Sequence, residues 1–125
     1  MNERPALVRI EQQADDAEAR VVITLEWHEH EYLGEASGSS DEAARPRLLG
    51  EATLRAVEAL DDRFHLALEA IATTDLGESR VAMAQVAMDE GDMLVGSAML
   101  RQDDPAAAPV RAVLDAINRK LLLEL

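Results

Sequence analysis

The sequence contains no cysteine among its 125 residues. That absence excludes a disulfide scaffold, a thiol nucleophile and zinc sites built on thiolates. Aromatic residues are almost absent too, with one Phe, one Trp and one Tyr. So few rings provide no platform on which nucleic-acid bases could stack. A single domain of this length buries about two thirds of its unfolded surface, so it can fold without a covalent or metal staple.

Basic residues and long apolar runs are scarce as well. The chain has 12 Lys and Arg residues against 25 Asp and Glu residues, a net charge of −13. Affinity for a phosphate backbone comes from cationic side chains, so we expect no nucleic-acid partner. The sequence shows neither an apolar run of about 18 residues nor the apolar segment of a signal peptide. We therefore expect a cytoplasmic protein that does not enter a membrane.

The short motifs of common catalytic sites are also missing. No Gly-x-Ser-x-Gly, phosphate-binding loop or His-Glu-x-x-His occurs. His28 and His30 flank Glu29 at an expected hairpin tip. A solvated turn is more common at such a tip than a metal site. The acidic tip at 89–92 has the same interpretation. We expect no catalytic residue, no metal and no cofactor, and a small enzyme is the remote alternative.

What the chain does contain is an internal repeat at a spacing of 60 residues. The stretches 20–40 and 80–100 both open with Arg-Val, pass through an acidic tip and return through Gly-x-Ala. Two extra residues at the second tip are offset by two fewer before the second helix. Such self-similarity indicates a duplicated structural unit. The matching residues are Asp15, Glu18, Arg20, Val21, Ala52, Leu54 and Ala56 with Asp75, Glu78, Arg80, Val81, Ala112, Leu114 and Ala116.

Apolar periodicity predicts the same elements in both units. Alternation predicts strands over 7–12, 20–27, 32–38 and 64–72, and a hairpin over 80–100, with turns at 14–19 and 73–79. Helical spacing predicts helices over 46–61 and 106–123, the second capped by Asp104. The predicted fold is α+β in one domain, 1–125. It is an internal duplication of two β-β-β-α units, 6–62 and 63–125, with antiparallel strands and the two helices packed on one face.

The second hairpin is apolar on both faces of its first strand. Val81 and Met83 lie on one face, and the other carries Ala82, Ala84, Val86 and Met88. A strand of this kind is usually buried on both sides. The helices can cover only one side of this strand. We therefore expect the other side to be covered by a second subunit, in a homodimer, or by the partner unit of the same chain.

Small residues set the expected helix packing. The repeated alanines lie a helical turn apart and should face a sheet or the other helix, with Gly34 and Gly96 on the opposing strands.

This pattern resembles the C-terminal regulatory domain of 2-isopropylmalate synthase and its citramalate synthase relatives. The likeness covers nearly the whole chain and is closest in the second helix, which has Asp104, Ala108, Ala112 and Ala116-Ile117-Asn118, and in the return through Val95-Gly96. The family's first unit has Gly-Pro-Val-Asp-Ala at its helix start, where this chain has Ala44-Arg45-Pro46-Arg47-Leu48. The resemblance implies a free-standing regulatory-type domain, since the catalytic barrel of the family is missing.

Two functional hypotheses follow. The first is a non-catalytic, dimeric regulatory domain that binds a small metabolite such as a branched-chain amino or keto acid, with Asp104, Asn118 and Gly96 as the candidate ligand-binding residues. The second is a module that binds only protein, itself or a partner. The first predicts a pocket between units or subunits, and the second predicts an apolar sheet face without a pocket.

Overall fold

The computed structural model describes residues 4–89 and 91–124, with side chains up to residue 118. Each unit consists of three strands followed by a helix, which confirms the predicted β-β-β-α duplication. The elements are β1 (Ala6–Ala14), β2 (Glu18–Trp27), β3 (His30–Ser39), a short 3-10 helix η1 (Glu42–Ala44), α1 (Arg45–Leu60), β4 (Leu66–Leu76), β5 (Ser79–Met88), β6 (Met93–Met99) and α2 (Ala107–Glu124).

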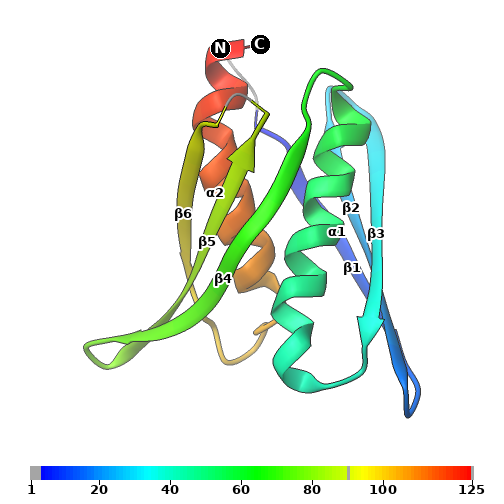
Figure 1. Ribbon diagram of the computed structural model, residues 1–125, viewed down its shortest axis with the longest axis vertical. Helices are drawn as coiled ribbons and strands as arrows, with labels where there is room; N and C mark the ends of the chain where they lie inside the picture. The colour runs from blue at the N-terminus through cyan, green and yellow to red at the C-terminus, as the bar shows by residue number, and fades with distance from the viewer. Residues whose placement is uncertain (1–3, 90, 125) are drawn as a thin grey trace.

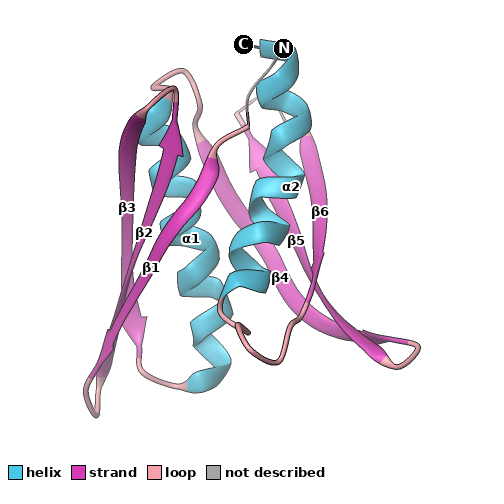
Figure 2. Cartoon of the chain, turned by 180° about the vertical axis from the view of Figure 1, so that it is seen from behind, coloured by secondary structure: helices cyan, strands magenta, loops and turns pink. Residues whose placement is uncertain are grey.

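The strands form two separate antiparallel sheets. The first sheet has the order β1-β2-β3 and the second has the order β4-β5-β6. Figures 1 and 2 show both helices side by side between the two sheets. Helix α1 packs on β2 and β3 and also contacts β4, while α2 packs on β5 and β6. Each sheet therefore carries its helix on its inner face, and its outer face has no covering element within the described chain.

The predicted helices are accurate to one residue at each end, since α1 spans 45–60 and α2 spans 107–124. Both helices have a proline in the first turn, Pro46 in α1 and Pro109 in α2. A proline is tolerated there because the N–H groups of a first turn have no acceptor within the helix.

One predicted turn is wrong. Strand β4 continues to Leu76, so the turn expected over 73–79 shrinks to Gly77 and Glu78. Thr73 and Thr74 pair with Ala82 and Val81. Threonine is β-branched and suits a strand, and its polarity reflects an exposed strand end rather than a turn.

The predicted contact between glycines and alanines is confirmed in both units. A Cβ atom added to Gly34 would overlap the Ala52 carbonyl oxygen and the Ala56 nitrogen of α1. One added to Gly96 would overlap the same two atoms of Ala112 and Ala116 in α2. Each helix therefore touches the backbone of its third strand directly, which only glycine permits.

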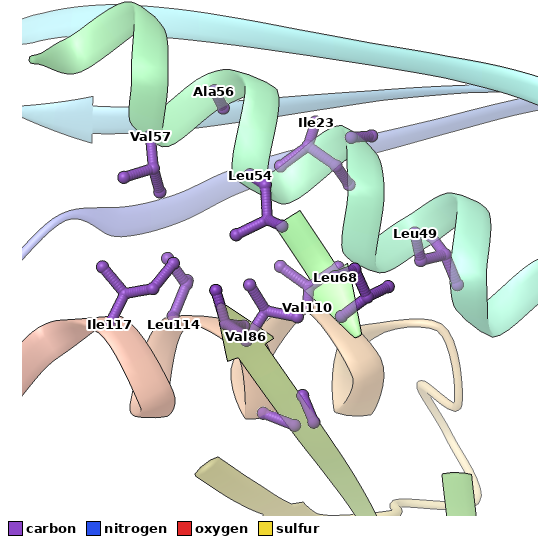
Figure 3. Close-up of a cluster of buried hydrophobic side chains, with 14 of the residues drawn as sticks. Ile23, Leu49, Leu54, Ala56, Val57, Leu68, Val86, Val110, Leu114 and Ile117 are labelled. Atoms are coloured by element: carbon purple, nitrogen blue, oxygen red, sulfur yellow. The ribbon is translucent and has the colours of Figure 1, made fainter. Parts of the chain in front are cut away.

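The core lies between the helices and continues onto both sheets. Figure 3 shows Leu54 of α1 pointing toward α2, from which Val110, Leu114 and Ile117 point back. Leu54, Val110 and Ile117 are fully buried. Val86 of the second sheet closes this cluster from one side, so the two units share a single core.

The strand register corrects the repeat by one residue. Ile23 lies opposite Gly34, and Ala84 lies opposite Gly96. Ile23 therefore corresponds to Ala84, at a spacing of 61, so the expected match of Val21 with Val81 is wrong. Because side chains alternate, a shift of one residue changes the face of every side chain on a strand. By this alternation Val21 lies on the inner face of its sheet and Val81 on the outer face, where Val81 is nevertheless only 8% exposed.

The same shift separates the two arginines that the repeat matched. Arg20 lies on the outer face of the first sheet, paired with Ser37. Arg80 shares the inner face of β5 with Ala82 and Ala84, which are buried. Its side chain is more than half exposed and lines a groove between the two units.

Candidate functional site

A groove with a volume of 510 Å³ lies where the two helices begin. It runs between the inner faces of the two sheets at the end shown at the bottom of Figure 1. Both units line it, so it lies at the boundary predicted by the ligand-binding hypothesis. Its lining residues are Gln12, Glu42, Arg45, Pro46, Leu49, Thr73, Arg80, Leu100, Pro105, Ala106 and Pro109.

The lining is symmetric in part. Pro46 and Ala106 occupy equivalent places before or within the first helical turns, as do Leu49 and Pro109. These residues form an apolar floor. One equivalent pair differs in chemistry: the first unit contributes the charged Arg45, and the second contributes the apolar Pro105 at the matching position.

Two guanidinium groups give the groove its polarity. Nη1 of Arg45 donates a hydrogen bond to Oε1 of Gln12 at 2.9 Å. Nε of Arg45 is buried and has no hydrogen-bond partner in the described structure. Nε of Arg80 lies 3.3 Å from Oδ1 of Asp75, in a pair whose side chains are mostly exposed. An exposed pair of this kind is weak, so Arg80 can exchange its partner at low cost.

The groove has the composition of a site for a small anion with an apolar body. Arginine presents a planar set of donors that matches a carboxylate. Glu42 is the acidic residue among the lining residues and can pair with an ammonium group.

The structure places Asp104 just outside this groove. Asp104 is exposed and precedes Pro105, which lines the groove. Helix α2 begins at Ala107, so the predicted cap by Asp104 is wrong. Its backbone carbonyl accepts a hydrogen bond from the Ala107 nitrogen at 3.3 Å and forms a turn.

Asn118 lies far from Asp104. It is eleven residues beyond the start of α2, about 16 Å along the helix axis at 1.5 Å per residue. It lines a shallower hollow of 320 Å³ between α2 and the start of β1, together with Pro5, Leu7, Arg111, Leu114 and Asp115. Oδ1 of Asn118 is buried there without a hydrogen-bond partner in the described structure.

Gly96 is in neither hollow, because it is buried beneath α2 against Ala112 and Ala116. The three residues predicted to bind a ligand therefore do not come together within one chain. Their role in ligand binding stays a prediction. For Gly96 the structure supplies a packing reason for the absence of a side chain.

Sequence reasoning missed Arg45 and Arg80 as a pair. Arg45 was visible as the departure from the segment Gly-Pro-Val-Asp-Ala of the resembling family. Arg80 was visible as a repeat residue, but the repeat by itself gave it no face and no role. Counting the face from the buried Ala82 and Ala84 would have turned it inward.

The hairpin tips hold no constellation that suggests chemistry. His28 and Glu29 form the first tip with φ angles of 51° and 68°. The second tip includes residue 90, which lies outside the described residues. Over residues 4–89 and 91–124, no three His, Asp or Glu side chains gather in a way that could hold a metal ion.

Comparison with protein families and with curated proteins gives no match. No family model matches the chain, and no curated protein matches it. Within the described part of the chain, neither helix is long and apolar enough to span a bilayer.

Proposed function

We propose that the chain is a non-catalytic, regulatory-type domain that binds a small carboxylate metabolite in the groove between the starts of α1 and α2. The observation that carries the proposal is that Arg45 of the first unit and Arg80 of the second both line a groove with an apolar floor. Ligand pockets combine mostly apolar walls with a few convergent polar groups. The groove has this composition.

The ligand class follows from the same residues. The carboxylate would replace Asp75 as the partner of Arg80 and approach the guanidinium group of Arg45. Leu49, Leu100 and Pro109 would contact a short aliphatic body. Branched-chain keto acids and amino acids both meet this description, and Glu42 gives the amino acids a partner for their ammonium group. This agrees with the sensing role implied by the resemblance to the regulatory domain of 2-isopropylmalate synthase.

Binding between two units provides a means of regulation. A ligand that contacts both units stabilises the arrangement in which they are packed together. A ligand at 100 times its Kd adds about 2.7 kcal/mol to the free energy of unfolding. For a chain of this size, that appears as an increase in Tm of several degrees.

The test is a thermal-shift screen of aliphatic amino and keto acids against the wild-type chain, Arg80→Gln and Arg20→Gln. Arg20→Gln is the matched control because it removes the same charge from the outer face. We expect the Tm increase to be lost in Arg80→Gln and kept in Arg20→Gln. A flat response of the wild-type chain at millimolar concentrations, or equal responses of all three proteins, contradicts the proposal.

The second candidate is a module that binds protein and has no ligand. The observation in its favour is the apolar outer face of the second sheet, where Met83 and Val95 are 43% and 53% exposed. This candidate predicts no Tm increase with any acid in the screen.

A further inference from the structure

The outward positions of the two sheets differ in charge. Paired strands define fourteen outward positions on each sheet. Seven of those on the first sheet are charged: Arg9, Glu11, Glu18, Arg20, Glu26, Glu31 and Glu35. None of those on the second sheet is charged, although Glu69, the exposed bulge residue of β4, is acidic and Val81 is only 8% exposed. The fourteen positions are Ala67, Ala70, Ala72, Thr74, Leu76, Ser79, Val81, Met83, Gln85, Ala87, Met93, Val95, Ser97 and Met99. The second set is called the methionine face below.

The methionine face is apolar as well as uncharged. Met83, Met93, Val95 and Met99 are between 43% and 53% exposed. Three of the five methionines of the chain are among them. Methionine is flexible and polarisable, and it recurs at surfaces that bind other proteins. An apolar patch of this kind on a soluble chain marks an interaction site.

We propose that a second copy of this chain docks on the methionine face, sheet against sheet, across a twofold axis. The inference is independent of the ligand proposed above. Its first argument is charge: the net charge of −13 makes two copies repel each other. The paired positions of the methionine face carry no carboxylate, so two copies meet there with less repulsion than on the charged face of the first sheet. An uncharged face is also complementary to itself, as a twofold interface requires.

The size of the face agrees with a dimer of modest affinity. Three strands about 4.8 Å apart, each with about seven paired residues rising 3.4 Å, span roughly 14 by 24 Å. Its footprint of about 340 Å² on each partner lies at the bottom of the range of weak, transient interfaces, which bury less than about 600 Å² on each partner. We expect a Kd in the micromolar range. Aligned packing of two sheets is a common arrangement for such faces.

Pairing through the edge of β6 is a less suitable alternative. The backbone N–H of Ser97 points away from β5 and donates a hydrogen bond to Oδ2 of Asp115 at 3.0 Å. Helix α2 thereby occupies a position that an added strand would need, which is a recognised way to protect an edge. The partner therefore approaches the face rather than the edge.

Val95 and Leu33 provide a matched pair of variants. Each directly precedes the glycine that touches its helix, and the two are 53% and 57% exposed. Val95 lies on the methionine face and Leu33 on the charged face. Sedimentation equilibrium of the wild-type chain, Val95→Glu and Leu33→Glu up to several hundred micromolar tests the proposal, with the Tm of each variant confirming that it is folded.

We expect the wild-type chain to reach twice its monomer mass of 13.6 kDa. Val95→Glu should weaken association at least about 100-fold, because it places two like charges in an apolar interface. Leu33→Glu adds the same charge outside the interface, so it should change the dissociation constant of the dimer less than about threefold. Added salt should strengthen the wild-type dimer, since it screens the repulsion between the acidic copies.

Three results overturn the proposal. They are a wild-type chain that stays at 13.6 kDa at high protein and salt concentrations, a dimer unchanged by Val95→Glu, and a dimer dissociated equally by both variants. A methyl NMR titration adds a check at single residues. The resonances of Met83, Met93 and Met99 should shift with protein concentration; if they do not, the interface lies elsewhere.

Discussion

The two units have nearly the same interior and opposite exteriors. Inside each unit, a glycine of the third strand touches two alanines of the helix, at Gly34 and again at Gly96. Outside, the first sheet is crossed by ion pairs, including Arg9 with Glu31 at 3.8 Å. The corresponding face of the second sheet has no charged position in its paired register. Packing thus constrains both units alike, and the outer faces are free to differ.

A shift of one residue in β5 produces much of this difference. It turns Val81 and Met83 outward and turns Arg80 inward to the groove. The same short segment therefore supplies apolar side chains to the proposed interface and a guanidinium group to the proposed ligand site. Both proposals depend on a register that the sequence repeat, taken alone, assigns differently.

The largest effect should come from filling the contact shared by both units. In Gly34→Ala and Gly96→Ala, the new Cβ overlaps backbone atoms of the facing helix, which cannot rotate away. Each variant should lose about 3 kcal/mol or more of unfolding free energy, at or above the upper end for an overpacked core. Urea denaturation measures the loss. If Gly96→Ala costs less than half as much as Gly34→Ala, the two interiors are not equivalent.

Much of this interior could be predicted from sequence. Helical and strand periods located α1 and α2 to within one residue, and the repeated small residues identified the glycine contacts. These features depend on local period and side-chain size, which the sequence displays directly. We also predicted that the helices pack on one sheet face. Within each unit this is what the structure has, since each sheet carries its own helix on its inner face.

The candidate site could not be predicted in the same way. The groove depends on how two sheets and two helices come together, and Gln12, Arg45 and Arg80 are distant in sequence. The repeat matched Arg20 with Arg80, but the two residues are one register apart and lie on opposite faces of their sheets. Asp104 suggested a cap by its type, but the helix begins three residues later.

A smaller effect should come from enlarging an alanine on either helix. Ala52 and Ala112 are fully buried and face the third strand of their own sheet. Ala52→Leu and Ala112→Leu should each cost ~2 kcal/mol, less than the glycine variants because a leucine can choose among rotamers. The two losses should agree within about 1 kcal/mol. A loss in only one of the two helices would restrict the equivalence of the units to their strands.

The smallest effect concerns the charged face of the first sheet. Nε and Nη2 of Arg20 donate hydrogen bonds to Glu35 at 2.6 and 2.9 Å. These bonds from Arg20 hold the pKa of the Glu35 carboxyl below its ordinary value. A lowered pKa in the folded state gives stability that is present above the unfolded pKa, about 4.3, and is lost as the pH falls through the folded pKa.

Carboxyl NMR titration measures this effect at a single residue. In Arg20→Gln the pKa of Glu35 should rise toward its ordinary value, and in Arg80→Gln it should stay low because Arg80 lies on an inner face. Added salt should weaken the effect in the wild-type chain, since the pair is exposed. The titration should also be independent of protein concentration, because this face stays in water when the methionine face is covered. A pKa of Glu35 that changes with protein concentration would place the first sheet in the interface and reverse the comparison of the two faces.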